Sequence, residues 1–547
     1  MRGMRVQAKG FARMALFALA MLMLLVAIWM CAGKAYAADS AGEASPDALQ
    51  AASSAEPFST DTAPQLLQTA AKAAAPKVTY RVRYQYKKWE SWKKNGQLAG
   101  KAGSKKTING LSLKVKGVKG LAGGIKYAVK EVGAGWQAWK ANGKVAGGGN
   151  GSGIEAFRAK LTGKLAKKYH VYYRVQMQGS GWQTWRFNAQ VAGTPAKGSR
   201  IIGLEVNLVP KNAKSFKART GWVSIVNFSN LGSPQANYSA LNSVISSKRM
   251  TIVNIKTNLK VAHALKPNSN KVVNATGRKI VVTDNGSGLF TNDSTAAKYT
   301  NLVRLTIRGG LWRNANIAAC NASGHSLIRL SFASNIELLD FTIKDGYQNH
   351  AVELIACKDV NVCNVKLLAS GKCPSDCTND QLQIDLADHV AAPSVPAKLC
   401  NGTPSKNFFV YQSTFKGARG LGCNWAYANA KHCKASNYHS NIVIKNCIIT
   451  GKTSEALSVF NTKSATIEGN TIKTYAPLDR DAYSVGCHVA YMDGSGPASS
   501  ASNVISIGNN VVYGGRQAIY VYTHNDSAFG TVYVYGLTAT NLGYGTK

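Results

Sequence analysis

From residue 335 onward, short stretches of alternating apolar and polar residues recur, each followed by a turn and a second alternation that often begins with Asn or Ser. The copies cover residues 335–343, 359–367, 407–415, 441–449, 464–472 and 503–511. The closest pairs start 24 residues apart (335 and 359) and 23 residues apart (441 and 464). This spacing is typical of one coil of a parallel β-solenoid with three short strands per coil.

Partner strands lie between these copies, at 350–356, 380–387, 456–460, 487–491 and 518–522. Because side chains alternate across a strand, the apolar pair Val352 and Leu354 predicts that Glu353 and Ile355 point outward. Aligning the other coils by their apolar pairs gives a first outward column of Glu353, Gln383, Gly422, Ser458, His488 and Tyr520. A second column holds Ile355, Asp385, Asn424, Phe460, Ala490 and Tyr522. At the strand entrance stand His350, Asp380, Arg419, Glu455 and Gln517.

Carboxylates on this outward sheet predict a catalytic site. Glu353 and Asp385 would be one coil and two strand positions apart, about 8 Å from spacings of about 4.8 and 6.6 Å. An inverting glycosidase holds its acid and base about 6.5–9.5 Å apart, with one carboxyl kept protonated by its surroundings. Asp385 is the first catalytic candidate and Glu353 its partner. Further candidates are Asp380, His350, Asp388 and His389.

The same face offers groups that could hold a sugar. Tyr520, Tyr522 and Trp425 could stack on sugar rings, and His488 stands in the same column. Arg419 could bind a uronate carboxylate with two hydrogen bonds. Solenoids are also decorated with polar residues for solubility, so a purely structural interpretation of these columns stays open.

A different repeat occupies the N-terminal part of the chain. Trp89, Trp136 and Trp182 are 47 and 46 residues apart, and each is followed three residues later by a second Trp. Alternating stretches on both sides predict three small tandem β modules at about 76–123, 124–168 and 169–211. We expect the first Trp of each pair to fill a module core. The second, at Trp92, Trp139 and Trp185, is the better candidate for contact with a sugar.

These repeats are strongly basic. The chain has 66 Lys and Arg against 26 Asp and Glu, a net charge of +40, and residues 78–211 alone hold 26 basic and 4 acidic residues. Such a charge attracts polyanions. In an exported protein we expect wall polymers, acidic polysaccharides or other anionic surfaces as partners rather than nucleic acid.

The N-terminus predicts export. Basic residues, an apolar run over about 14–30 and Ala35-Tyr36-Ala37 indicate a signal peptide at 1–37. The alternative is that this apolar run is a single membrane anchor. If the signal peptide is cleaved, we expect no membrane span in the remaining chain. The protein would then lie outside the cell or on its wall. Residues 38–75 form a spacer poor in large apolar groups, and 212–245 a linker.

All ten cysteines of the exported protein fall between Cys320 and Cys487. Because export places thiols in an oxidising compartment, we expect disulfides, with Cys373, Cys377 and Cys400 fastening an insertion between coils. A metal site is the weaker interpretation, because no suitably spaced second ligand pair accompanies these cysteines.

Two resemblances add to this. The stretch 181–194, with Trp182, Trp185, Asn188 and Ala192-Gly193-Thr194, resembles the clostridial hydrophobic W (ChW) repeat, which implies adhesion or targeting. Residues 265–282 (LKPNSNKVVNATGRKIVV) are similar to the opening coils of pectin-lyase-like right-handed parallel β-helices, a likeness covering about 250–540. The fold class predicted is therefore all-β, three repeat modules followed by a right-handed parallel β-helix at 246–547.

The resemblance does not fix the chemistry. Polygalacturonases of this fold carry an Asn-Thr-Asp strand, an Asp-Asp pair and a Gly-His-Gly, and this set is absent from the sequence. Calcium-dependent lyases need converging carboxylates, so calcium is expected only if the protein is a lyase; no other cofactor motif appears. We expect a secreted, surface-associated polysaccharide hydrolase or lyase. The alternative is a non-catalytic adhesin or glycan-binding β-helix.

Overall fold

The computed structural model describes residues 75–543 with internal gaps. Residues outside the description are 1–74, 86, 117, 119, 149–150, 285–287, 316–325, 349, 391, 425–436, 480–482, 492–495, 524–529 and 544–547. The predicted signal peptide and almost all of the predicted spacer therefore lie outside the described residues. Among the described residues, no helix is long and apolar enough to cross a lipid bilayer.

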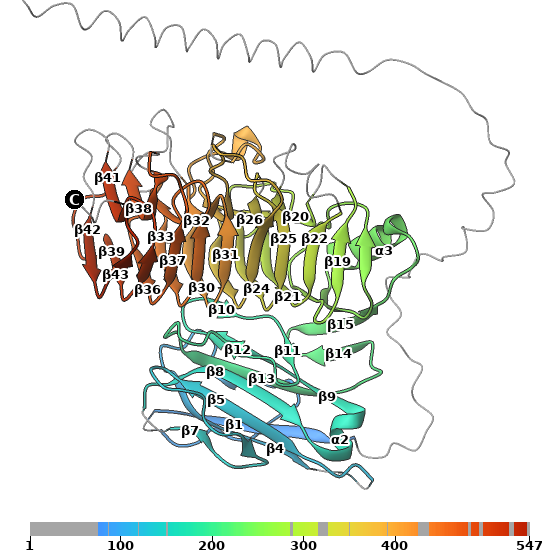
Figure 1. The fold of residues 1–547 in the computed structure, drawn as a ribbon. Coiled ribbons are helices and arrows are strands. Elements are labelled where there is room, and N and C mark those ends of the chain that lie inside the picture. The colour runs from blue at the N-terminus through green and yellow to red at the C-terminus, as the bar shows by residue number, and fades with distance from the viewer. Residues whose placement is uncertain are drawn as a thin grey trace, which may run out of the picture. The chain divides into compact units, whose positions relative to one another are not determined.

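The three tryptophan repeats have equivalent strands (Figure 1). The first repeat contains β1 (Lys77–Tyr84), β2 (Lys93–Lys94), β3 (Ala99–Gly100) and β4 (Ile108–Lys116). The second contains β5 (Ile125–Glu131), β6 (Lys140–Ala141), β7 (Ala146–Gly147) and β8 (Ile154–Leu161), followed by α2 (Gly163–Lys168). The third contains β9 (Tyr169–Met177), β10 (Gly181–Trp182), β11 (Arg186–Phe187), β12 (Ala192–Gly193) and β13 (Ile201–Pro210).

A short strand of each repeat pairs with a strand of another repeat. β7 of the second repeat pairs with β4 of the first, and β12 of the third pairs with β8 of the second. β3 of the first repeat pairs in turn with β13 of the third, so the pairing between repeats forms a closed cycle. One hydrophobic core contains side chains from all three repeats. The three repeats thus form one cyclic domain, which relieves each small unit of the need to bury a core alone.

The large core anchors of this domain are tyrosines. Tyr80, Tyr127 and Tyr173 stand at equivalent positions, are fully buried, and donate their hydroxyls to backbone carbonyl oxygens of Gln97, Lys144 and Gln190, respectively. The expectation that the first tryptophan of each pair fills the core is wrong. Trp89, Trp136 and Trp182 remain partly exposed, because the tyrosine rings already occupy the interior.

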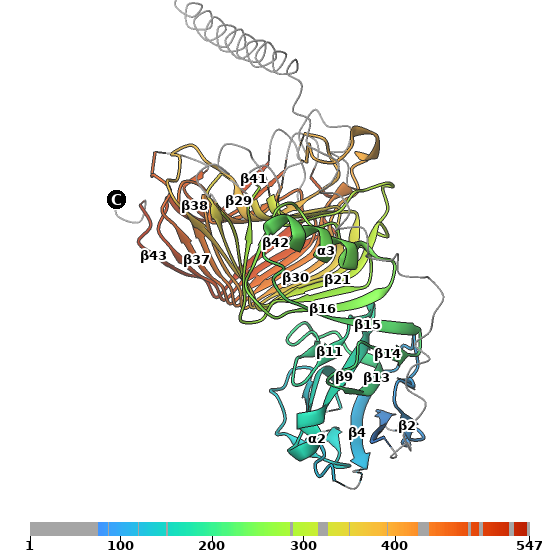
Figure 2. The same ribbon diagram turned by 90° about the vertical axis from the view of Figure 1, so that its right-hand side faces the viewer.

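A parallel β-helix follows, built from three sheets (Figures 1 and 2). Sheet 1 contains β14 (Ser215–Ala218), β15 (Gly221–Phe228), β16 (Met250–Ile255), β18 (Lys271–Asn274), β21 (Leu302–Arg308), β24 (Ala333–Leu339), β27 (Lys358–Cys363), β30 (Lys406–Tyr411), β33 (Ser440–Lys445), β36 (Ala465–Glu468), β39 (Val504–Gly508) and β42 (Thr531–Tyr535). Sheet 2 contains β17 (Leu259–Val261), β19 (Lys279–Val282), β22 (Leu311–Asn314), β25 (Thr342–Gly346), β28 (Lys366–Ser370), β31 (Thr414–Gly417), β34 (Ile448–Gly451), β37 (Thr471–Thr474), β40 (Val511–Tyr513) and β43 (Thr538–Thr540). Sheet 3 contains β20 (Phe290–Thr291), β23 (Ser326–Ser331), β26 (His350–Ile355), β29 (Asp380–Asp385), β32 (Arg419–Cys423), β35 (Leu457–Phe460), β38 (Val485–Tyr491) and β41 (Gln517–Thr523). The predicted fold class is confirmed.

The segment 212–245, expected as a linker, is structured. It forms β14, β15 and the helix α3 (Pro234–Ser246), whose N-terminus is capped by the Ser233 side chain accepting from the Ala236 amide. β15 pairs in parallel with β16, so sheet 1 extends back to residue 215. α3 packs Leu241 and Ile245 into the core of the β-helix. The segment is therefore part of the first coils.

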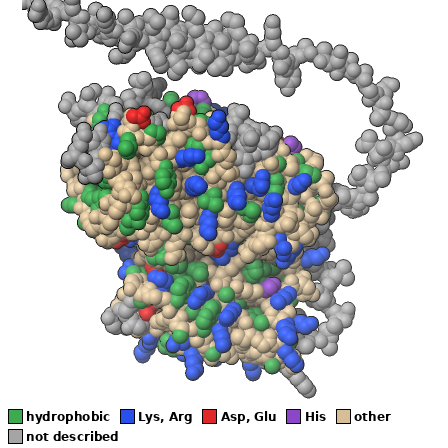
Figure 3. Space-filling model, viewed as in Figure 1, with side chains coloured by type: hydrophobic (Ala, Val, Ile, Leu, Met, Phe, Trp, Pro, Cys, Tyr) green, Lys and Arg blue, Asp and Glu red, His purple; other side chains and the backbone are tan. Residues whose placement is uncertain are grey.

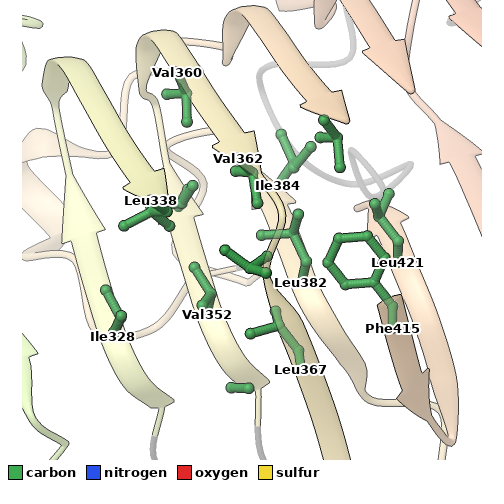
Figure 4. Packing of buried hydrophobic residues seen from close by; sticks show 14 of the residues in the cluster. Ile328, Leu338, Val352, Val360, Val362, Leu367, Leu382, Ile384, Phe415 and Leu421 are labelled. Atoms are coloured by element: carbon green, nitrogen blue, oxygen red, sulfur yellow. The ribbon is translucent and has the colours of Figure 1, made fainter. Parts of the chain in front are cut away.

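The core is a stack of like positions. Ile328, Val352, Leu382 and Leu421 come from successive strands of sheet 3 and project inward together (Figure 4). Such stacking fixes the register, since a slip of one residue would turn every apolar side chain outward. The alignment of the sheet 3 strands by their inward apolar pairs, made from the sequence, depends on this fixed register.

The disulfide prediction is wrong for the described residues. The eight cysteines among them are all free thiols, including Cys373, Cys377 and Cys400. Four others occupy inward strand or turn positions within the apolar core: Cys357, Cys423, Cys447 and Cys487. There cysteine acts as a small apolar side chain, a role that its spacing along the sequence does not distinguish from pairing.

The third repeat contacts sheet 1 of the β-helix. Arg186 forms a buried ion pair with Glu337 at 2.5 Å, and Thr184 lies 2.6 Å from the hydroxyl of Thr306. Trp185, Phe216, Ile252 and Val272 share an apolar cluster beside these polar contacts.

Candidate functional site

The outward face of sheet 3 brings the predicted residues together in the predicted register. Glu353 pairs with Gln383, Gln383 with Gly422, and then follow Ser458, His488 and Tyr520. In the second column Ile355 pairs with Asp385. The first predicted column is confirmed, and so are the parts of the second column that pair Ile355 with Asp385 and join Phe460, Ala490 and Tyr522. The sequence alignment missed Arg329, which precedes Glu353 in the first column.

These outward side chains are nevertheless buried. Glu353, Asp380 and Asp385 expose 3%, 2% and 0% of their surface. Part of the cover is the segment 386–405, whose Ala387, Ala392, Val395 and Leu399 pack on Ile355 in the second column. Glu353, Gln383, Ser458 and His488 in the first column are buried as well.

Asp385 and Glu353 influence each other electrostatically. Burial, and next the charge of Glu353, raise the pKa of Asp385 well above its usual range. Gln383 donates from its amide nitrogen to both oxygens of Asp385 at 2.9 Å and fixes the carboxyl plane. Glu353 accepts from the Ser326 hydroxyl at 2.6 Å and from Arg329 at 2.5 Å. The pair thus consists of a carboxyl that favours its proton and a carboxylate paired with a cation.

A second ionic group lies beside this pair. Arg419 donates to Asp380 at 3.3 Å and to Glu455 at 2.7 Å. Burial raises the pKa of Asp380 to about 7, an effect that the Arg419 charge only partly offsets. Although burial acts in the other direction, Arg419 and His488 hold the pKa of Glu455 down at about 2. One arginine therefore leaves the two carboxyls in opposite protonation states over a wide pH range.

This arrangement corrects the role expected for Arg419. Both terminal nitrogens of its guanidinium group face carboxylates of the protein, and the side chain is buried. The two carboxylates raise the pKa of Arg419 further, so it remains a cation. Its charge is used within the sheet, and a uronate carboxylate would have to compete with Asp380 and Glu455 for it.

Gly422 is closely covered by its neighbours in the first column. A Cβ atom at this residue would lie 2.2 Å from the Ser458 hydroxyl and 2.4 Å from Oδ1 of Asp380, so a larger residue would displace both. These two oxygens and both ring nitrogens of His488 are buried and find no hydrogen-bond partner among the described residues. Buried polar atoms of this kind normally have a partner, which a bound water molecule or a ligand hydroxyl would supply here.

Aromatic rings continue the column. The His488 ring lies 5.0 Å from the Tyr520 ring, and Tyr520 stacks on Tyr522 at 5.8 Å with an interplanar angle of 18°. Phe460 meets His488 edge-on at 4.9 Å. Tyr520 and Tyr522 are partly exposed at this end of the sheet.

The remaining predicted site residues do not belong to the two outward columns of sheet 3. Nδ1 of the partly buried His350 lies 2.7 Å from the Asp380 carbonyl oxygen, and burial lowers the pKa of His350. Asp388 and His389 belong to the segment 386–405, not to the outward columns; one Asp388 oxygen accepts from the Val390 amide at 2.8 Å. Trp425 lies outside the described residues. Glu455, Ser458 and Gly422 were visible in the aligned columns but not chosen as site residues.

The three tryptophans predicted as contacts differ: Trp92 is partly exposed, as is Trp139, and Trp185 is buried. Trp185 is 1% exposed and packs edge-on against Phe216 at 5.0 Å, so the predicted contact role is wrong: the third repeat is covered there. Among the described residues, no group of three or more His, Cys, Asp or Glu side chains is arranged to hold a metal ion.

Comparison with known families agrees with the repeat. Residues 176–210 match the family described as Clostridial hydrophobic W (ChW). A search of curated proteins found no match.

Three solved β-helix structures are similar to this chain. The surface protein and adhesin PfbA of Streptococcus pneumoniae is 15% identical, with a TM-score of 0.37, covering 56% of this chain and 94% of that one. An exopolygalacturonase of Thermotoga maritima is 9% identical, with a TM-score of 0.26, covering 55% and 88%. The A-module of the Azotobacter vinelandii mannuronan C-5 epimerase AlgE6 is 13% identical, with a TM-score of 0.21, covering 56% and 94%. Likeness of this extent concerns the fold and not the chemistry on its surface.

Proposed function

We propose that this protein is an exported, surface-associated enzyme that hydrolyses a polysaccharide on the outward face of sheet 3. The observation that carries the proposal is the pair Asp385 and Glu353, which face the same side on adjacent strands, where burial and the charge of Glu353 raise the pKa of Asp385. Carboxyl groups with shifted pKa values that lie together on one face are typical of catalytic sites.

The two carboxyls suit different roles. Asp385, whose pKa is raised, would hold its proton and give it to the oxygen of the leaving sugar. Glu353, as a carboxylate, would take a proton from the attacking water. Their register, one coil and two positions apart, corresponds to about 8 Å, which leaves room for that water and predicts inversion at the reacting carbon.

Hydrolysis fits the described residues better than elimination. A lyase acting on a uronate must neutralise the substrate carboxylate next to the proton that it removes. The two arginines of the outward columns and entrance, Arg329 and Arg419, are both paired with carboxylates of the protein. Free positive charge is therefore scarce beside Asp385 in the described part of the sheet.

The sugar next to the scissile bond would lie against Asp380, Ser458 and His488. Asp380, Ser458 and His488 present buried polar atoms there without described partners, suited to sugar hydroxyls. Tyr520 and Tyr522 would stack on further sugar units along the sheet. The long columns of a β-helix suit an extended polymer better than a small molecule.

A non-catalytic glycan-binding protein is the second candidate. The burial of Asp380, Arg419 and Glu455 as one ionic group favours it, because such a group could simply join adjacent coils. Binding without turnover would then be the whole activity of sheet 3.

A screen for cleavage tests the proposal. The full chain would be incubated with neutral and acidic polysaccharides while new reducing ends and the absorbance of unsaturated uronates are followed. Asp385→Asn should lower the release of reducing ends about 100- to 10,000-fold, because it removes the proton donor but keeps the shape. Glu468→Gln, which removes a partly exposed acid paired with Lys445 on sheet 1, serves as the matched control and should leave the rate unchanged.

The outcomes separate the candidates. Unchanged turnover in Asp385→Asn would refute the assignment of the acid. Saturable binding to a glycan with no cleavage of any polymer would favour the binding protein. Unsaturated products would replace hydrolysis by elimination.

A further inference from the structure

Each tryptophan repeat holds one guanidinium group between two indole rings. Arg81 lies 4.6 Å from the ring centres of both Trp89 and Trp92. In the second repeat, Arg158 lies 4.3 Å from Trp136 and 4.7 Å from Trp139. In the third, Arg174 lies 4.8 Å from Trp182 and 4.9 Å from Trp185.

The arginine does not come from the same strand in each repeat. Arg81 and Arg174 stand on the first strand of their repeats, where the second repeat has Ala128; Arg158 stands on the facing strand, opposite Ala128. The three repeats therefore supply the same group to the same place from two different strands. This internal compensation indicates that the space between the indoles requires a cation, which is part of the framework of the repeat.

A second cation lies against the outer indole in two repeats only. Lys114 lies 4.1 Å from the Trp92 ring, and Lys160 lies 4.6 Å from the Trp139 ring. Both lysines are exposed. The third repeat has the buried Asn207 at the equivalent position, where Trp185 is covered by Phe216. The exposed lysine is thus present in the first and second repeats, where the second tryptophan is partly exposed. It is absent from the third repeat, where that tryptophan is buried.

The acidic residues of the repeat domain do not neutralise these lysines. Glu90 accepts from the Gly100 amide, and Glu131 from the Gly148 amide. Glu155 binds Lys130 and two backbone amides, and Glu205 binds Arg174 and Arg219. All four acids of residues 78–211 are engaged inside the domain, while many Lys and Arg side chains lie on its surface (Figure 3).

There is open space beside one of these pairs. Trp92 lines an open hollow together with Lys93, Lys217 and Arg219. An anionic group placed there would meet positive charge on several sides and an indole wall.

We propose that the first and second repeats bind a flexible polyanion, a surface polymer with repeating phosphate or carboxylate groups, through Lys114 on Trp92 and Lys160 on Trp139. Each site alone binds weakly, because exposed ion pairs contribute little. Two equivalent sites on one rigid domain bind one polymer chain much more tightly than either alone. This inference is independent of the activity proposed for sheet 3.

Binding of defined polymers to the full chain tests it. The probes are a polyglycerol phosphate, polygalacturonate and neutral dextran, followed by titration calorimetry and tryptophan fluorescence. The double variant Lys114→Ala with Lys160→Ala should weaken polyanion binding at least tenfold and remove the fluorescence change. The matched control, Lys116→Ala with Lys164→Ala, removes the same charge from exposed lysines away from the indoles and should weaken binding less than threefold.

Each result decides the proposal. Binding of only one of the two polyanions identifies phosphate or carboxylate as the group recognised, and either supports it, as does weakening by salt. Equal losses in the two double variants would overturn it, because general charge would then explain the binding. Failure of the unaltered protein to bind either polyanion, or equal binding of dextran, would also overturn it. Thermal melting verifies that every variant is folded.

Discussion

At the scale of single residues, the site depends on how one arginine divides its charge. Arg419 lies closer to Glu455 (2.7 Å) than to Asp380 (3.3 Å), and the pKa values follow: about 2 for Glu455 and about 7 for Asp380. The sequence placed these three residues at one strand entrance. It could not show that they pair with each other, because that depends on side-chain direction and on burial by distant segments.

The raised pKa of Asp380 predicts a pH dependence of stability. In the unfolded chain this carboxyl ionises near 3.8 and in the folded protein near 7, so the folded state binds more protons between these values. The free energy of unfolding should therefore fall as the pH rises from about 4 to about 7. Asp380→Asn cannot ionise, so the stability of this variant relative to the unaltered protein should increase over this range by up to about 4 kcal/mol.

Urea unfolding at several pH values measures this difference. Glu455→Gln is the opposing control: because the pKa of Glu455 is depressed, its contribution is present above about pH 4.5 and is lost as the pH falls toward 2. Parallel pH curves for the unaltered protein and Asp380→Asn would contradict the electrostatic description of the site.

At the scale of elements, a left-handed residue near the start of the sheet 1 strands explains why so many coils begin with Asn or Asp. Asn335, Asp359, Asn407 and Asn441 all have φ between 55° and 57°, in the left-handed region. Their side chains also bond along the stack, from Asn441 to Asn407 at 3.1 Å and from Asn407 to Asp359 at 2.9 Å. The sequence pattern thus revealed the coil period and, through the apolar pairs, the register of sheet 3.

Asn407, the second residue of β30, allows a test of this left-handed position. Asn407→Ala should destabilise the protein by about 2–3 kcal/mol, since alanine is strained at this φ and both side-chain bonds are lost. Asn407→Gly loses the same bonds without the strain and should cost about 1–2 kcal/mol. Equal losses in urea unfolding would show that strain at this φ is unimportant.

At the scale of the whole molecule, the sequence was less informative. It predicted three tandem modules, but it did not predict that β3, β7 and β12 each complete the sheet of another repeat. Pairing across repeats depends on long-range contacts that leave no local pattern. For the same reason the burial of Trp185 was not predicted, because Phe216 covers it from a segment outside the repeats. The cover over sheet 3 follows Asp385 directly in the chain, but the sequence pattern does not show where the segment 386–405 packs.

Because strands of the three repeats pair in a closed cycle around one core, we predict that the repeats are destabilised together. Tyr127→Ala removes a fully buried anchor from the second repeat and should cost about 3–5 kcal/mol. Because one core joins all three repeats, hydrogen exchange should accelerate in β1, β4, β9 and β13 as well as in β5 and β8. Acceleration confined to residues 125–161 would indicate independent modules instead.

The central claim is that winding of the β-helix brings Asp385 and Glu353 to one face as an acid and a base. The rate at which new reducing ends appear from a susceptible polysaccharide, compared between the unaltered chain and Asp385→Asn, tests it most directly. We predict steady release by the unaltered protein and a loss of at least about 100-fold in the variant. Equal rates in the two proteins, with both folded, would contradict the claim.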